Sequence, residues 1–263
     1  MKTILLCIGF SIFIFFSSCS KTEDVKAQAS DKTNTPISAT VSEPSLDSGL
    51  ICYLPFKKNL KDFSGHGNSG TLHGTISYVA DRFGTAQRAV SFAASNAFIE
   101  IPEKDVIGLT EATVSIDFYP TSTNLQLLLS KISYSTGTDL PGFYQSLELL
   151  QNGGVTFGVR KEGFCDATAG TEWCPFLNSN TSVILNQWNH VAATFTNKIE
   201  HLYLNGNLVA ASSKTPSPIC QGEPIRLGVW WQSDPLYFTG YMDEVRIYNR
   251  ALTLKEIKQL SSL

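Results

Sequence analysis

The chain has 263 residues, 43% of them hydrophobic, and carries 20 basic against 23 acidic side chains, a net charge of −3. No basic run or stripe appears in it, so the sequence argues against a nucleic acid as a partner. Residues 47–263 are numerous enough to form one large domain with a substantial core.

Residues 1–18 have the form of a secretory signal. Lys2 precedes an apolar run from Ile4 to Phe16, which is too short to stay in a bilayer as a spanning helix. The run ends at Ser17-Ser18-Cys19, which resembles a bacterial lipobox, where the cysteine becomes the lipidated first residue. We therefore expect export and a membrane anchor through Cys19 at the bacterial cell envelope, on the outer membrane or the cell surface. A plain signal peptide with an incidental cysteine is the alternative.

Residues 19–46 predict a flexible stalk. They include no aromatic residue and are rich in Ser, Thr, Lys, Asp and Glu. Such a segment has too little apolar surface to offset the entropy that is lost when it becomes ordered.

From residue 110 onward, the pattern predicts short strands. Val114, Ile116 and Phe118 alternate with polar residues until Pro120 ends the run. The tetrapeptide Gln151-Asn-Gly-Gly154 predicts a hairpin, because Asn-Gly accommodates positive φ angles. Similar runs to the C-terminus bring the total to about a dozen strands, which indicates two stacked antiparallel sheets.

A second Asn-Gly pair, Asn205-Gly206, predicts the last turn of a meander that begins near Trp188. We expect Trp188 and His190 to be structural residues, because both belong to an alternating run. The alternatives are that Trp188 stacks on a sugar and that His190 is a base or a ligand.

Two of the six cysteines lie in or next to the leader, and the others are Cys52, Cys165, Cys174 and Cys220. An exported protein meets an oxidising environment, in which four cysteines permit three pairings. We expect a disulfide between Cys165 and Cys174, which lie in one loop; a bridge from either of them to Cys220 is the alternative. Cys52 is expected to be a buried free thiol.

Aromatic residues gather in irregular segments of the second half of the domain. Clustered at one rim or on a concave sheet, they would stack on sugar rings while amide and carboxyl groups bond the hydroxyls. The candidate ligand-binding residues are Tyr144, Trp173, Phe176, Trp231, Gln232, Asp234 and Tyr237. The alternative is that these aromatic rings cover the cysteine-containing loop and bind nothing.

The segment Phe238–Leu252 predicts a closing strand. Its residues change side at every step, which puts Tyr241 and Val245 on the same face. Thr253 and Glu256 then have the spacing of a helical capping box, so a short helix is expected at the C-terminus.

The closing segment Phe238-Thr-Gly-Tyr-Met-Asp-Glu-Val-Arg-Ile-Tyr-Asn-Arg-Ala-Leu252 resembles the C-terminus of LamG-like jelly-roll domains of the concanavalin A-like lectin/glucanase superfamily. Further blocks follow the order of that family: Gly49–Phe56, Asp62–Gly70, Asp81–Gly84, Phe98–Ile101 and Trp188–Val191. The resemblance covers residues 47–263 and implies an all-β fold, a two-sheet antiparallel jelly-roll sandwich. Since the superfamily includes lectins, glycosidases and adhesion modules, the fold does not by itself assign a function.

The resemblance also implies a calcium ion between the loop from Asp62 to Asn68 and the closing strand, with Asp62 and Asp243 as carboxylate ligands. Asn68 is a further candidate, because Ca²⁺ takes carboxylate, amide and backbone oxygens. The alternative is that Asp62 and Ser64 only bond their own turn.

Catalysis is disfavoured by the sequence. Laminarinase-type enzymes of this architecture carry a Glu-x-Asp-x-x-Glu run, which is absent here, and Asp243 and Glu244 are expected to point to opposite faces of a strand. We therefore expect a non-catalytic lipoprotein that binds carbohydrate. The alternative is an adhesion or structural protein of the envelope that binds another protein, and a glycoside hydrolase is the least favoured reading.

Overall fold

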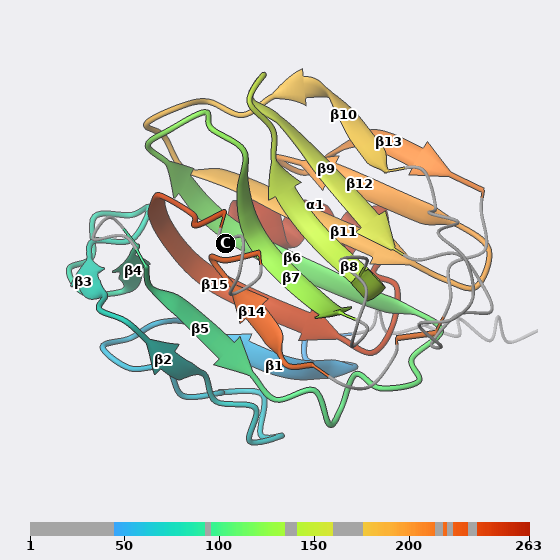
Figure 1. Ribbon diagram of the computed structural model, residues 1–263, viewed down its shortest axis with the longest axis horizontal. Coiled ribbons are helices and arrows are strands. Elements are labelled where there is room, and N and C mark those ends of the chain that lie inside the picture. The colour runs from blue at the N-terminus through green and yellow to red at the C-terminus, as the bar shows by residue number, and fades with distance from the viewer. Residues whose placement is uncertain are drawn as a thin grey trace, which may run out of the picture. The chain divides into compact units, whose positions relative to one another are not determined.

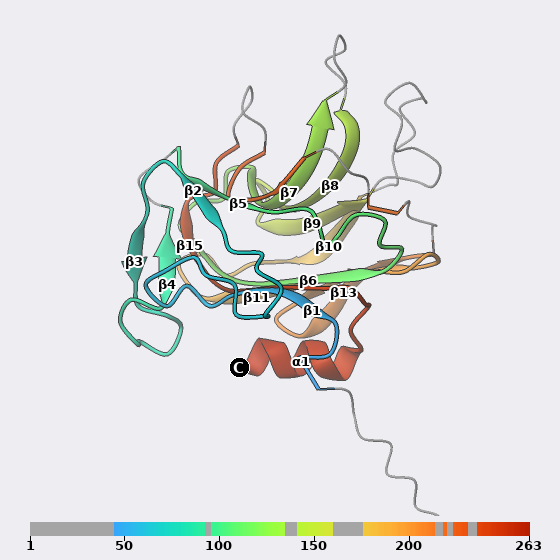
Figure 2. The ribbon, with the colours of Figure 1, turned by 90° about the horizontal axis from the view of Figure 1, so that it is seen from below.

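The computed structural model describes residues 45–92, 96–134, 141–159, 176–213, 218–219, 223–230 and 236–263. The chain divides into two compact units, residues 1–42 and 43–263, and every described residue belongs to the second. This unit consists of two stacked antiparallel sheets and one helix that lies outside the sandwich (Figures 1 and 2). The predicted two-sheet sandwich with a short C-terminal helix is confirmed.

One sheet has eight strands. Its main path runs in the order β13 (Asn207–Ser212), β12 (Glu200–Leu204), β11 (Asn189–Phe195), β6 (Ala112–Pro120), β15 (Gly240–Tyr248), β4 (Ala89–Ser91) and β3 (Ser77–Val79). The remaining strand, β1 (Leu50–Leu54), pairs with β15 beyond the end of β4, as expected for a closing strand.

The other sheet has seven strands. Its order is β10 (Leu177–Ser182), β9 (Gly154–Val159), β8 (Pro141–Leu149), β7 (Gln126–Tyr134), β14 (Ile225–Leu227), β5 (Phe98–Ile101) and β2 (Thr71–His73). All described pairs in both sheets are antiparallel.

The core fills the space between the two sheets. Alternate residues of the central strands meet there, among them Ile116 and Phe118 from β6 and Leu147 and Leu149 from β8. Cys52 belongs to this core as a free, buried thiol, as expected, and burial raises its pKa well above the ordinary value.

Both predicted hairpins are present. Residues 150–153 join β8 to β9, with the amide of Gly153 donating to the carbonyl of Leu150 at 2.8 Å. Asn205 and Gly206, which join β12 to β13, have φ angles of 49° and 75°. Two successive positive φ angles are what a two-residue hairpin turn requires.

The predicted alternation of β15 is wrong at its centre. The register against β6 shifts between Asp243 and Arg246, and Glu244 has a φ of 52°, so the strand contains a bulge. Met242 and Val245 consequently both enter the core, whereas Tyr241 faces outward and does not share the face of Val245. The extra residue changes the phase of the strand, which periodicity alone does not reveal.

Helix α1 (Leu254–Ser262) covers part of the outer face of the eight-stranded sheet (Figure 2). Ile257 and Leu260 pack there against Tyr203 and Tyr248. The predicted capping box is confirmed, because Thr253 and Glu256 each accept from the backbone of the other. Among the described residues, no helix is both long and apolar enough to cross a membrane.

Candidate functional site

The outer face of the seven-stranded sheet carries a band of polar side chains. In β7, β8, β9 and β14, residues that enter the core alternate with residues that point outward. The outward-pointing set is Ser130, Ser146, Glu148, Thr156 and Arg226, none of which exposes more than 8% of its surface. Register aligns Arg226 with Ser130 and Ser130 with Ser146, so donors and acceptors follow one another across three adjacent strands.

Charged side chains extend this polar band across β5 to β2. The Nε of Arg226 donates to Glu100 at 3.0 Å, and its Nη2 donates to Glu223 at 2.8 Å. The second carboxylate oxygen of Glu100 lies 2.9 Å from Nε2 of His73. Lys131 lies on the opposite side of β7, the side of Leu129; it is 1% exposed and donates to the carbonyl of Glu223 at 2.6 Å, and its burial lowers the pKa of the ammonium. Arg226, Glu100 and His73 are therefore held in fixed positions by mutual hydrogen bonds.

The candidate aromatic residues within the described ranges lie in this sheet or in segments next to its strands. Tyr144 is in β8, where its backbone pairs with Ile132 of β7. Phe176 directly precedes β10 and is 37% exposed, and Tyr237 is half-buried in the segment between β14 and β15. The other predicted residues lie outside the described part of the chain: Cys19, Cys165, Trp173, Cys174, Trp231, Gln232 and Asp234.

The loop after β1 is organised by Asp62. Its Oδ1 accepts from the amides of Tyr53 at 2.9 Å and Ser64 at 2.8 Å, and its Oδ2 accepts from the hydroxyl of Ser64 and the amide of Asn68, both at 2.8 Å. Burial raises the pKa of Asp62, but these bonds outweigh it and leave the pKa below the ordinary value. Asp62 therefore shapes its own turn, as the alternative to metal binding proposed.

The two other candidate calcium ligands are placed differently. The Nδ2 of Asn68 donates to Asp105 and to the carbonyl of Ile51, both at 2.7 Å, and its buried Oδ1 has no partner within the described residues. Asp243 belongs to another group of contacts, on the eight-stranded sheet. In the described ranges no three His, Cys, Asp or Glu residues are grouped to hold a metal ion, and calcium binding stays a prediction.

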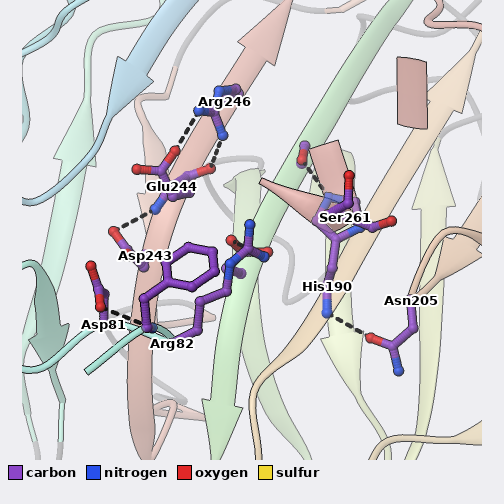
Figure 3. A network of polar contacts seen from close by, with 12 residues as sticks. Asp81, Arg82, His190, Asn205, Asp243, Glu244, Arg246 and Ser261 are labelled. Carbon is purple, nitrogen blue, oxygen red and sulfur yellow. Dashed lines mark hydrogen bonds and ion pairs between the residues drawn. The ribbon is translucent and has the colours of Figure 1, made fainter. Parts of the chain in front are cut away.

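A second polar group lies on the outer face of the eight-stranded sheet (Figure 3). Register brings His190 of β11, Asp117 of β6 and Asp243 of β15 into neighbouring positions. Arg82, from the loop between β3 and β4, pairs with Asp117 at 2.7 Å, and the hydroxyl of Ser115 lies 2.9 Å from Nε2 of His190.

Burial shifts the pKa values of Asp117, Asp243 and His190 in this cluster. It raises the pKa of Asp117 to about 7 against the attraction of Arg82. It raises the pKa of Asp243 to about 8, and the neighbouring Glu244 carboxylate adds to that rise. Burial also lowers the pKa of His190 to about 3, so this imidazole is neutral at pH 7.

The bulge of β15 directs Glu244 toward other partners. Arg246 forms an ion pair with Glu244 (Figure 3). The hydroxyl of Tyr53 donates to the same carboxylate at 2.8 Å. The guanidinium of Arg246 also lies 4.2 Å from the centroid of the Tyr53 ring. Arg246 is thus engaged by Glu244 and Tyr53.

A cavity of about 180 Å³ adjoins this cluster. It is lined by Lys57, Asp81, Arg82, Phe83, Arg88, Asp243, Glu244 and Leu263. Asp81 and Arg82 were not predicted as site residues, since they stand in the sequence only as part of the family block Asp81–Gly84. One pattern in the sequence does indicate this polar cluster. The alternation of β6 puts the charged Asp117 on the face opposite to the apolar residues of that strand.

Trp188 belongs to a group of three aromatic rings on the same outer face. Its ring centroid lies 5.9 Å from that of Tyr119 and 6.4 Å from that of Tyr241, and the two tyrosines stack at 5.0 Å. Trp188 is therefore half-buried and packs on the surface of the sheet, outside the main core.

Solved structures with the same fold include proteins of several kinds. Domain 4 of AbnA, a GH43 extracellular arabinanase from Geobacillus stearothermophilus solved in complex with arabinotriose, is 23% identical at a TM-score of 0.61, over 81% of this chain and 98% of that one. The binding domain of Paraclostridial Mosquitocidal Protein 1 is 18% identical at a TM-score of 0.61, over 82% of this chain and 52% of that one.

A third similar structure is the binding domain of botulinum neurotoxin DC in complex with rat synaptotagmin II. It is 14% identical at a TM-score of 0.58, over 83% of this chain and 52% of that one. This chain thus spans about half the length of the two toxin domains. These identities show a common fold only.

Among curated proteins, no sequence matches this chain. A sequence profile of laminin G type, described as the concanavalin A-like lectin/glucanases superfamily, matches residues 93–258. The profile covers more than half of the chain and agrees with the two-sheet architecture. The chain therefore belongs to the concanavalin A-like lectin/glucanase superfamily.

Proposed function

We propose that this chain is a non-catalytic protein that binds carbohydrate on the outer face of its seven-stranded sheet. The observation that carries the proposal is the placement of the partly exposed aromatic residues Phe176 and Tyr237 beside strands of this sheet, whose outer face carries the polar band. Sugar sites combine such fixed hydrogen-bonding groups with aromatic rings. The polysaccharide fragment bound by the arabinanase domain of the same fold supports this choice.

Aromatic residues occur in the strands of this sheet or close to them in the sequence. Phe176 stands half-exposed at the start of β10, Tyr144 lies in β8, and Trp231, with Gln232 and Asp234, follows β14. In this proposal the rings stack on sugar faces, while the amide and carboxyl groups of Gln232 and Asp234 bond hydroxyls. Trp173 and Tyr237 would extend the same surface.

The charges of this face support binding rather than hydrolysis. A glycosidase needs two carboxyl groups about 5 Å apart, or about 6.5–9.5 Å apart, on either side of the scissile bond. Glu100 is engaged by Arg226 and His73, and Glu148 accepts from the hydroxyl of Ser146. These carboxylates serve the hydrogen-bond network of the sheet, so we expect no release of reducing sugar from polysaccharides.

A glycan array followed by calorimetry tests the proposal. We expect dissociation constants on the order of 10–1000 μM, because shallow sites keep little free energy after ordering costs. Phe176→Ala and Trp231→Ala should each weaken binding at least fivefold. Phe63→Ala is the matched control, since Phe63 is 52% exposed but follows β1 of the other sheet, and it should bind as wild type does.

A protein partner is the competing function. Its support is that a similar toxin binding domain, of which this chain spans about half, was solved in complex with synaptotagmin II. If wild type binds no glycan, or if both aromatic variants bind as wild type does, an adhesion or structural role in the envelope replaces the carbohydrate proposal.

We also propose that Cys19 carries the lipid anchor and that the domain is displayed at the cell envelope. The support is the apolar leader that ends at this cysteine. Metabolic labelling with a fatty acid should mark the wild type and leave Cys19→Ser unlabelled. Labelling of both proteins would contradict the assignment.

A structural calcium ion remains a separate proposal, supported by the buried, unpartnered Oδ1 of Asn68. A ligand that binds only the folded state raises the melting temperature. Millimolar calcium should therefore raise the Tm relative to chelator, and Asn68→Ala should lose that rise. An unchanged Tm in the wild type would show that the domain binds no stabilising calcium ion.

A further inference from the structure

We propose that the cavity beside β15 is a second binding site, which holds the protonated amine of an amino sugar between Asp81 and Asp243. The cavity adjoins the eight-stranded sheet and shares no residue with the polar band described above. The inference therefore goes beyond the proposed function and does not depend on it.

Each of the two carboxylates presents an oxygen without a partner. The Oδ1 of Asp243 accepts from the amide of Glu244 at 2.8 Å, whereas Oδ2 has no hydrogen bond or ion pair to any described residue. The Oδ1 of Asp81 accepts from the amides of Phe83 and Thr85 at 2.9 and 2.8 Å, and its Oδ2 is equally unpartnered there. Asp243 is only 3% exposed and yet lines the cavity, so its available oxygen faces this space and not bulk water.

The neighbouring arginines do not neutralise these carboxylates. Arg82 pairs with Asp117 at 2.7 Å, and Arg246 pairs with Glu244 (Figure 3). A buried carboxylate that lacks a cation is costly, and Asp243 therefore holds a proton up to about pH 8. A donor-bearing cation that binds there lowers this cost and displaces the proton. A primary ammonium offers three donors and a positive charge, which two adjacent carboxylate oxygens can share.

The remaining walls favour an amine that belongs to a sugar. Lys57 and Arg88 line the cavity without an ion pair to Asp81 or Asp243, and they supply donors for hydroxyl and ring oxygens. The Phe83 side chain is 68% exposed at the same cavity and offers an apolar surface to a sugar ring. A volume of about 180 Å³ corresponds to about six waters of liquid, which suits one small polar ring.

A metal ion fits the cavity less well than an amine does. Hard cations such as Ca²⁺ need six to eight converging oxygens. In the described residues no three acidic, His or Cys side chains are grouped around one point, and Lys57, Arg82 and Arg88 line the same walls. A ligand with one amine and several hydroxyl groups uses both the acidic and the basic walls.

Calorimetry on the full-length chain with three sugars tests the proposal: glucosamine, N-acetylglucosamine and glucose. These differ at one position, where only glucosamine carries a positive charge near neutral pH. We expect glucosamine to bind at least tenfold more tightly than the other two. Asp243→Asn keeps the shape of the side chain and should abolish this preference.

Two further variants separate loss of the site from loss of the fold. Asp81→Asn retains the Oδ1 that accepts from its turn, so it should stay folded and weaken glucosamine at least fivefold. Glu111→Gln removes an exposed carboxylate that does not line the cavity and should bind as wild type does.

Three results would overturn the inference. The first is no binding of glucosamine by the wild type, and the second is equal binding of all three sugars. The third is a calcium-dependent rise in Tm that Asp243→Asn removes, since the cavity would then hold a metal. Because Phe176→Ala tests the seven-stranded sheet alone, failure at one site is distinguishable from failure at the other.

Discussion

His190 is a buried imidazole with no acidic partner. It is 4% exposed, its Nδ1 has no hydrogen-bond partner among the described residues, and Arg82 and Arg246 lie in its electrostatic surroundings. Burial first, and then the two arginines, lower its pKa to about 3, against an ordinary value of 6.5. The folded protein therefore resists protonation at a position where the unfolded chain accepts a proton.

The buried groups of this cluster predict opposite effects of acid on stability. Between pH 6.5 and 3 the unfolded state binds more protons at His190 than the folded state, so the contribution of His190 to the free energy of unfolding falls as pH falls. The raised pKa values of Asp117 and Asp243 act in the opposite direction between about pH 7 and 4. In urea denaturation at several pH values, His190→Gln should therefore gain stability relative to wild type as pH falls below 6.5, by up to about 1 kcal/mol for each pH unit. A stability difference between the two proteins that does not change with pH would contradict the assignment.

Trp188 and Phe118 are both aromatic residues but lie in different layers of the molecule. It packs on Tyr119 and Tyr241 outside the core, whereas Phe118 is fully buried inside it. Trp188→Ala should lower the free energy of unfolding by about 2 kcal/mol and leave the protein folded, because much of the ring already faces solvent. Phe118→Ala should cost more, about 3–5 kcal/mol. Urea denaturation compares the two, and complete unfolding of Trp188→Ala would refute the expected difference.

Among the secondary-structure elements, the sequence predicted the turns and the helix cap. The Asn-Gly turns and the capping box were predictable because each depends on a few adjacent residues, such as Asn205-Gly206 or Thr253 and Glu256. The bulge at Glu244 was not, because its cause is the simultaneous pairing of β15 with β1, β4 and β6. A contact between distant strands leaves no periodic trace in the sequence.

The capping box gives a prediction for α1. Thr253 accepts from the amide of Glu256, and Glu256 in turn accepts from Thr253 and pairs with Arg250 at 2.6 Å. Thr253→Ala should lower the free energy of unfolding by about 1 kcal/mol. Thr253→Ser keeps the hydroxyl and serves as the control in thermal denaturation. A Thr253→Ala variant as stable as Thr253→Ser would show that the cap contributes nothing.

For the whole molecule, the fold was more predictable from the sequence than the candidate sites were. Family blocks at both ends of the domain identified the sandwich, because each block lies at a strand or turn that the core requires. The cavity was missed because Asp81, Arg82 and Asp243 come from distant segments that only the completed sheet brings together. The polar band could be inferred only once strand order was known, since alternation does not say which strands are neighbours.

Residues 47–263 should fold without the preceding segments. Their described part has a continuous core, and β1 near the start pairs with β15 near the end. We expect this fragment to unfold in one cooperative transition seen alike by far-ultraviolet circular dichroism and tryptophan fluorescence. Separate transitions from the two probes would show that the domain is not one cooperative unit.

The pairing of β1 with β15 also determines how tension would pass through the protein. The chain enters the domain at Ser48 and Gly49, whose carbonyls accept from Arg250 at 2.7 Å and from Asn249 at 2.8 Å. A pull on the N-terminal side therefore loads these two bonds first, then the β1–β15 ladder, and through Arg250 the capped start of α1. The seven-stranded sheet lies outside that path, so its outer face can keep its geometry while the N-terminal attachment is under mechanical load.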